Sequence, residues 1–78
     1  MKVIIYSKEN CPNCVKAKAL MDKYNPTILK IGENISRDKF FEKFPNAKTV
    51  PQIEIDGEHI GGYGELVEWV NYNDEQQF

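Results

Sequence analysis

The chain has few of the residues that stabilise small domains through cross-links or metal ions. Among its 78 residues are two cysteines and one histidine, which cannot supply the four ligands of a structural zinc site. Only two residues separate Cys11 from Cys14, so a bond between them would close a small ring and restrict the chain little. We therefore expect residues 1–78 to form one domain that depends on an economical hydrophobic core.

Long apolar runs and an excess of positive charge are also absent. The apolar run near the N-terminus is too short for a signal peptide or a membrane span. A net charge of −2 is not typical of a nucleic-acid-binding domain. We expect a monomeric cytoplasmic protein with no membrane or nucleic-acid partner. In that reducing compartment a cysteine pair is more often catalytic or metal-binding than structural.

The charges that are present are unevenly distributed. Met1–Tyr24 contains five lysines and two acidic residues, whereas Gln52–Phe78 contains seven acidic residues and no lysine or arginine. The two ends could pack side by side and attract each other. The alternative is a basic rim around the cysteines that favours a thiolate and anionic substrates.

The first half of the chain has the pattern of a strand, a helix and a second strand. Residues 2–7 are almost continuously apolar, which is typical of a strand buried on both faces. The run Val15–Tyr24 has helical spacing, and Pro12 suits the first turn before it. Thr27–Ile31 predicts a second strand, parallel to the first because a helix separates them.

A second helix is predicted after Ser36, a suitable N-cap residue. Its apolar stripe consists of Phe40, Phe41 and Phe44, which we interpret as core residues. Pro45 ends this helix.

The last third of the chain predicts a hairpin and a third helix. Gln52–Ile55 alternates as a half-exposed strand does, and Asp56-Gly57 is a strong turn signal before the strand Glu58–Ile60. A helix then begins near Tyr63, and the polar residues Asn73–Phe78 are expected to fray. The predicted order is βαβ-α-ββ-α, an α/β class.

The two cysteines lie where the first strand gives way to the first helix. The helix N-terminus, Lys8, Lys16 and Lys18 should all favour the thiolate form of Cys11. Cys14 falls inside the first turn and should face the protein. We interpret Cys11 as the attacking nucleophile and Cys14 as the resolving thiol of a disulfide exchange.

Other interpretations of these residues remain open. Two inert buried cysteines, or half of a zinc or iron–sulfur site shared between subunits, would give the same spacing. The lone His59 is interpreted as a surface or partly packed residue and not as a catalytic base.

The full set of motifs resembles the glutaredoxin family over nearly the whole chain. The motifs, in order, are Tyr6-Ser7-Lys8, Cys11-Pro12-Asn13-Cys14, Thr49-Val50-Pro51-Gln52 and Ile60-Gly61-Gly62-Tyr63. The resemblance implies a thioredoxin-like fold, a four-stranded mixed sheet flanked by three helices. The first and last helices would lie on one face of the sheet and the middle helix on the other.

The resemblance also implies the site residues. The bond before Pro51 would be cis and would place Val50 beside Cys11, so that the Val50 backbone pairs with substrate. Cys11, Cys14 and Pro51 would be the catalytic positions. The glutathione-binding positions would be Lys8, Asn13, Thr49, Val50, Gly62, Tyr63, Gly64 and Glu65.

Two of these positions depart from the commoner family pattern. Asn13 stands where many members have Tyr or Phe, which removes an aromatic wall. Gly64 stands where a hydroxyl or an acidic side chain often occurs, which leaves Glu65 as the expected contact for the glutathione ammonium group.

The function implied by the resemblance is reduction of protein disulfides and glutathione mixed disulfides. Glutathione would be a co-substrate, with no bound cofactor or metal. Disulfide-containing or glutathionylated proteins would be the partners, ribonucleotide reductase being one candidate. The alternatives are a redoxin recycled by thioredoxin reductase and a carrier in which two chains and two glutathiones hold an iron–sulfur cluster.

Overall fold

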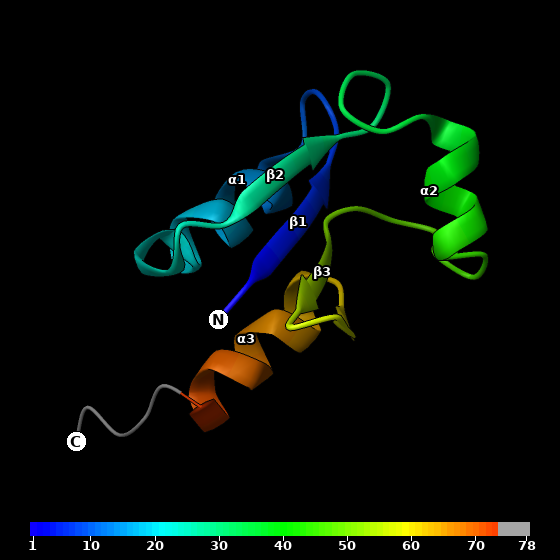
Figure 1. Cartoon of the computed structure of the whole chain (residues 1–78). Helices are drawn as coiled ribbons and strands as arrows, with labels where there is room; N and C mark the ends of the chain where they lie inside the picture. The colour runs from blue at the N-terminus through cyan, green and yellow to red at the C-terminus, as the bar shows by residue number, and fades with distance from the viewer. Residues whose placement is uncertain (74–78) are drawn as a thin grey trace.

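The computed structural model describes residues 1–73, and its elements follow the predicted order (Figure 1). They are β1 (Val3–Ser7), α1 (Pro12–Leu20), the 3-10 turn η1 (Asp22–Tyr24), β2 (Thr27–Lys30), α2 (Arg37–Lys43), β3 (Gln52–Ile55), β4 (Glu58–Gly61) and α3 (Tyr63–Asn73). The α/β class is confirmed. Of the expected frayed end, residues 74–78 lie outside the described part of the chain.

The four strands form one mixed sheet in the order β2-β1-β3-β4. The central strand β1 runs parallel to β2 and antiparallel to β3, so Ile5 lies opposite both Ile28 and Ile53. Strand β4 pairs antiparallel with β3 at the edge. The predicted parallel βαβ unit and the terminal hairpin are therefore both confirmed.

Helices cover both faces of this sheet, and Figure 1 shows α2 set apart from α1 and α3. Successive residues of a strand face opposite sides, so Ile5 and Tyr6 enter different cores. The core under α1 and α3 consists of Val3, Ile5, Ala17, Met21, Ile53, Ile55 and Leu66. The core under α2 consists of Tyr6, Phe40 and Phe44. This is the predicted layer arrangement, with the middle helix alone on its face.

Helix α1 differs in its bounds from the predicted helix Val15–Tyr24. It begins at Pro12, as the missing N–H of proline permits, and ends at Leu20. The last predicted turn is the 3-10 turn η1, which Asn25 ends with a positive φ of 52°. Asn tolerates this left-handed conformation, which stops the helix before β2.

Strand β3 is not half-exposed, which corrects the expectation from its alternating sequence. All four of its residues are buried, because α2 covers the face that carries Gln52 and Glu54. The polar atoms of Glu54 have partners there: Tyr6 donates its hydroxyl hydrogen to Glu54 Oε1 at 2.9 Å, and Lys43 Nζ lies 3.2 Å from Glu54 Oε2. Burial of the carboxylate is tolerable because both oxygens are paired.

The expectation that all three phenylalanines of α2 are core residues is wrong for one of them. Phe40 and Phe44 are 2% and 5% exposed, whereas Phe41 is 39% exposed. Residues at positions i and i+4 share a helix face, and position i+1 is turned about 100° away from it. Ser36 is the N-cap as predicted, since its Oγ accepts a hydrogen bond from Lys39 N at 3.1 Å.

Candidate redox site

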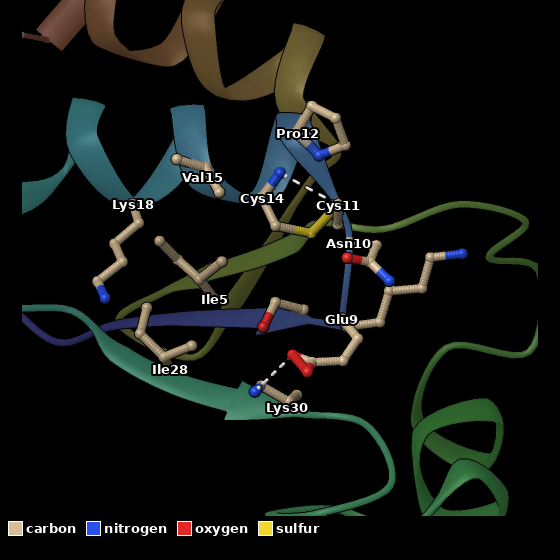
Figure 2. A pocket seen from close by; sticks show the side chains of 12 residues that line it. Ile5, Glu9, Asn10, Cys11, Pro12, Cys14, Val15, Lys18, Ile28 and Lys30 are labelled. Carbon is tan, nitrogen blue, oxygen red and sulfur yellow. Dashed lines mark hydrogen bonds and ion pairs between the residues drawn. A yellow bond between two sulfur atoms is a disulfide. The ribbon is translucent and has the colours of Figure 1, made fainter.

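The cysteines form a disulfide at the start of α1 (Figure 2). Cys11 is the N-cap residue in an extended conformation, and Pro12 follows it in the first turn. The N–H of Cys14 points at Cys11 Sγ, with 3.2 Å between the nitrogen and the sulfur. A free N–H at a helix N-terminus stabilises negative charge, so the same geometry favours a thiolate at Cys11 after reduction.

The two sulfur atoms differ in their access to solvent. Cys11 is partly exposed, and Cys14 is only 6% exposed because its side chain turns inward from the first helical turn. Asn13 and Pro12, between them, are exposed. The sulfur of Cys11 is therefore the more accessible of the two, and the order of attack stays a prediction.

A loop distant in the sequence closes against Cys11. The Val50–Pro51 bond is cis, and the carbonyl oxygen of Val50 lies 3.7 Å from Cys11 Sγ. The prediction of a cis bond that places Val50 beside Cys11 is confirmed. Pro51 is fully buried, and the next residue begins β3, so the loop is anchored in the sheet.

On the side of the disulfide that faces β2 there is a cavity of about 620 Å³ (Figure 2). Its walls include both cysteines, Ile28, Lys18 and Lys8. The latter two are cations of the proposed basic rim. Lys16, the third lysine of that expectation, is exposed on α1 and does not line this cavity.

An ion pair lies at the edge of the same cavity. Lys30 Nζ is 2.8 Å from Glu9 Oε1 and 3.2 Å from Glu33 Oε2. The hydrogen bond from Lys30 lowers the pKa of Glu9, and its carboxylate partners, Glu9 first, raise the pKa of Lys30. Both groups therefore stay charged at neutral pH, and Glu9 offsets the positive charge of Lys30 here.

A second cavity, of about 270 Å³, lies on the α2 side of the Thr49–Val50 segment. It brings together Lys8, Thr49 and Val50, three residues that the resemblance assigned to glutathione. Arg37 and Lys48 also line it, and neither was singled out from the sequence. Three cations around one small cavity suit an anionic group of a ligand.

The start of α3 forms the opposite wall of the site. Gly62 lies beside the cis-proline loop, since a Cβ atom at this position would be in van der Waals contact with the Pro51 carbonyl oxygen at 3.5 Å. The N–H of Gly62 donates to Glu65 Oε1 at 2.8 Å, the pairing of a capping box. Gly62 and Glu65 share a cavity of about 450 Å³ with Thr49.

Three of the predicted glutathione positions line none of these three cavities. Asn13 and Gly64 are exposed, and Tyr63 packs against the core under α1 and α3.

Within residues 1–73 no group of three or more His, Cys, Asp or Glu side chains could hold a metal ion. In the same residues no helix is long and apolar enough to cross a membrane.

Comparison with known proteins agrees with this geometry. The family model described as Glutaredoxin matches residues 3–60. Glutaredoxin 1 of Rickettsia prowazekii is 44% identical over 82% of this chain and 72% of its own length. Glutaredoxin 1 of Escherichia coli is 34% identical over 94% of this chain and 96% of its own length. For Glutaredoxin 1 of Rickettsia felis, 45% identical, the match covers only 63% of that protein.

Solved structures show the same fold. The structure of reduced E. coli glutaredoxin matches with a TM-score of 0.81 at 33% identity, covering 96% of this chain and 99% of that one. Glutaredoxin 1 of Francisella tularensis, complexed with cacodylate, matches with a TM-score of 0.77 at 35% identity, covering 95% and 96%. The thioredoxin-like fold is thereby confirmed. The chain belongs to the glutaredoxin family of thiol–disulfide oxidoreductases, as a dithiol member with Cys11 and Cys14 as its redox pair.

Proposed function

We propose that this protein reduces protein disulfides and glutathione mixed disulfides, with Cys11 as the nucleophile, Cys14 as the resolving thiol and glutathione as the reductant. The observation that carries the proposal is the asymmetry of the pair: the partly exposed Cys11 sulfur lies against the Val50 carbonyl, and Cys14 is buried behind it. Thiol–disulfide exchange needs one accessible thiolate and a second thiol within bonding reach.

The dithiol route runs in two exchanges. The Cys11 thiolate attacks one sulfur of a client disulfide, forms a mixed disulfide with it and releases the other client sulfur as a thiolate that takes up a proton. Cys14 then loses its proton and attacks Cys11 Sγ. That step forms the Cys11–Cys14 disulfide and releases the second client thiol.

Two glutathione molecules restore the dithiol. The first glutathione thiolate attacks Cys11 Sγ, forms a Cys11–glutathione mixed disulfide and releases Cys14 as a thiol. The second attacks the sulfur of the bound glutathione, forms glutathione disulfide and releases Cys11 as a thiolate. A glutathionylated substrate enters at the same mixed disulfide, so its reduction needs Cys11 and not Cys14.

The cationic cavity beside Thr49 and Val50 is the proposed site of the glutathione glycine carboxylate. Lys8, Arg37 and Lys48 line it, and all three side chains carry positive charge at neutral pH. The Val50 backbone would pair with the cysteinyl portion as a neighbouring strand does. Pro51 has no N–H, so it leaves this pairing to Val50.

The γ-glutamyl end would lie at the start of α3. The backbone N–H groups of Tyr63 and Gly64, next to Gly62 at this helix N-terminus, suit a carboxylate. Glu65 would meet the ammonium group with the oxygen that does not bind Gly62. Asn13 offers no aromatic wall, so the ionic contacts at both ends of glutathione carry more of the binding.

The proposed setting is a cytoplasmic monomer that acts on disulfide-containing or glutathionylated proteins. Among disulfide-containing proteins, ribonucleotide reductase is a candidate client, as the resemblance to the family implies. A dithiol mechanism suits such a client, since the resolving Cys14 lies within bonding distance of Cys11.

The test is turnover of a glutathionylated peptide with two regenerating systems. NADPH oxidation is followed with glutathione plus glutathione reductase, and separately with thioredoxin reductase alone. We expect turnover only with glutathione plus glutathione reductase, at a rate that saturates as the concentration of glutathionylated peptide rises. Turnover supported by thioredoxin reductase alone would show that this enzyme, and not glutathione, reduces the Cys11–Cys14 disulfide.

A further inference from the structure

A chain of side-chain contacts reaches the proposed substrate loop from the edge strand β4. Gln52 Nε2 donates to the carbonyl oxygen of Thr49 at 2.8 Å. Gln52 Oε1 lies 2.8 Å from Nε2 of His59. The chain thus links a residue of β4, through the first residue of β3, to the backbone of the Thr49–Val50 segment.

The direction of these hydrogen bonds is determined by chemistry. The Thr49 carbonyl can only accept, so the amide nitrogen of Gln52 must face it and the amide oxygen must face His59. His59 Nε2 therefore carries the hydrogen and donates to Gln52 Oε1. The terminal torsion of glutamine has no strong preference of its own, so the Thr49 carbonyl and the donor on His59 together hold the amide in this orientation.

The surroundings hold both side chains in place. Gln52 is 6% exposed under α2. His59 lies opposite Glu54 in the β3–β4 ladder, which puts its side chain on the same sheet face as Gln52. The His59 ring packs against Phe44, the C-cap residue of α2, with 4.4 Å between ring centroids. The Gln52 amide is buried and loses little entropy in making this contact. His59 is exposed, and its tilted packing on Phe44 restricts the ring from one side.

The Thr49 carbonyl matters because it shares a peptide plane with the Val50 N–H. In a trans peptide the C=O and N–H groups point in opposite directions. Fixing the Thr49 carbonyl toward Gln52 therefore aims the Val50 N–H the other way. The Val50 N–H is the donor that the proposed function assigns to the cysteinyl portion of the substrate.

We propose that His59 is a positioning residue for substrate binding: through Gln52 it fixes the Thr49–Val50 peptide so that the Val50 N–H meets the substrate. The inference rests on the proposed function for the role of Val50. It assigns a role in the reaction to a side chain that was predicted from the sequence to be a surface or partly packed histidine, 48 positions after Cys11 and 45 after Cys14.

The test compares two substitutions of His59 that separate its donor from its ring. His59→Phe keeps a ring on Phe44 and removes the donor, whereas His59→Gln restores an amide N–H at similar reach and removes the ring. For a glutathionylated peptide we expect His59→Phe to raise KM about threefold to tenfold, the loss of one hydrogen bond, with kcat within about twofold. His59→Gln should restore most of the KM. Glu58→Gln, next to it on β4, is the control with unchanged KM.

Two further measurements keep the inference testable independently of turnover. Amide hydrogen exchange of Val50 in the oxidised protein should accelerate in His59→Phe and return toward the wild-type rate in His59→Gln. In a Gln52→Met background, which already lacks the intermediate amide, His59→Phe should change KM no further.

The possible outcomes distinguish a failure of the inference about His59 from a failure of the proposed glutathione-dependent function. If the wild type turns over and His59→Phe leaves KM and Val50 exchange unchanged, His59 has no positioning role. A loss of kcat and thermal stability alone, without a KM change, would show a purely structural role. If the wild type itself does not use glutathione, the proposed function fails, and Val50 exchange still decides whether His59 fixes the loop.

Discussion

At the scale of single residues, the two cysteines differ in solvent exposure because one precedes the first turn of α1 and the other lies within it. Cys11 precedes α1 and presents its sulfur to solvent and to Val50, while Cys14 belongs to the helix and turns into the protein. Exchange chemistry makes unequal demands on the two thiols. The first must meet a large client, and the second must meet only Cys11.

This difference predicts separable losses of activity. Cys14→Ser should keep reduction of a glutathionylated peptide within about threefold and lower reduction of a protein disulfide at least about 100-fold, because no thiol remains to resolve the mixed disulfide. Cys11→Ser should abolish both activities. Both variants are compared with wild type in the same coupled assay. The reverse pattern would exchange the two roles.

The proposed function adds a binding role to the capping role that Glu65 has in the structure, and one substitution can separate the two. Glu65→Gln keeps an oxygen that accepts from Gly62 N–H and removes the negative charge. We expect KM for glutathione to rise about fivefold through the lost ion pair. The melting temperature should change by less than about 2 °C, because the cap remains.

Glu65→Ala serves as the comparison, since it removes the charge and the cap together. It should show the same rise in KM and, in addition, lower stability by about 1 kcal/mol. If Glu65→Gln leaves KM unchanged while Glu65→Ala destabilises, Glu65 is a helix cap without a role in binding.

Sequence motifs identified the site residues that lie within short conspicuous segments. They did not identify residues that reach the site only through the tertiary structure. Cys11 and Cys14 follow from one short motif, the cis bond before Pro51 follows from the family resemblance, and the structure places all three together. Arg37 and Lys48 were missed. Their charges gave no signal, because lysines are common on this surface and nothing local shows that α2 turns Arg37 toward Thr49.

At the scale of elements, helix α2 and strand β3 show where periodicity misleads. Gln52–Ile55 alternates polar and apolar residues, which normally indicates one exposed face. In the structure the polar face is covered by α2, and the side chains of Gln52 and Glu54 have partners beneath it. The alternating pattern correctly indicated which residues of β3 share a face. It could not indicate that a helix covers the face with the polar residues.

The two neighbouring phenylalanines of α2 give a direct test of its orientation. Phe40→Ala should lower the free energy of unfolding by about 3–5 kcal/mol, because the ring is 2% exposed and its loss leaves a cavity beside Tyr6 and Phe44. Phe41→Ala should cost less than about 1 kcal/mol, since its ring is 39% exposed. Urea unfolding monitored by circular dichroism measures both. Equal losses would mean that α2 presents a different face to the sheet.

At the scale of the whole molecule, one polar cluster joins three elements on the α2 side. Tyr6 of β1 donates to Glu54 of β3, and Lys43 at the end of α2 pairs with the other carboxylate oxygen. This cluster could not be predicted from the sequence, since 48 positions separate Tyr6 from Glu54 and the motif that contains Tyr6 gives no sign of its partner. It couples the sheet to the helix that carries Arg37 into the site.

The cluster predicts how stability changes at alkaline pH. Burial of the Tyr6 phenol, and next its hydrogen bond to Glu54, raise its pKa well above the ordinary value near 10. Between those two pKa values the unfolded chain has lost the proton and the folded protein still holds it. Stability from Tyr6 is therefore fully present below about pH 10 and decreases as pH rises further, by at most about 1.4 kcal/mol per pH unit.

Melting temperatures of the oxidised protein between pH 8 and pH 11 test this linkage, since the disulfide removes thiol titration from the comparison. Wild type should exceed Tyr6→Phe in melting temperature at pH 8, and the difference should shrink above pH 10 because Tyr6→Phe has no phenol to ionise there. Tyr72→Phe is the matched control: Tyr72 is 76% exposed, so its removal should leave the pH dependence of wild type intact. Parallel curves for wild type and Tyr6→Phe across the whole range would show that the Tyr6 proton is not linked to folding, and that the hydroxyl stabilises this face through its hydrogen bond alone.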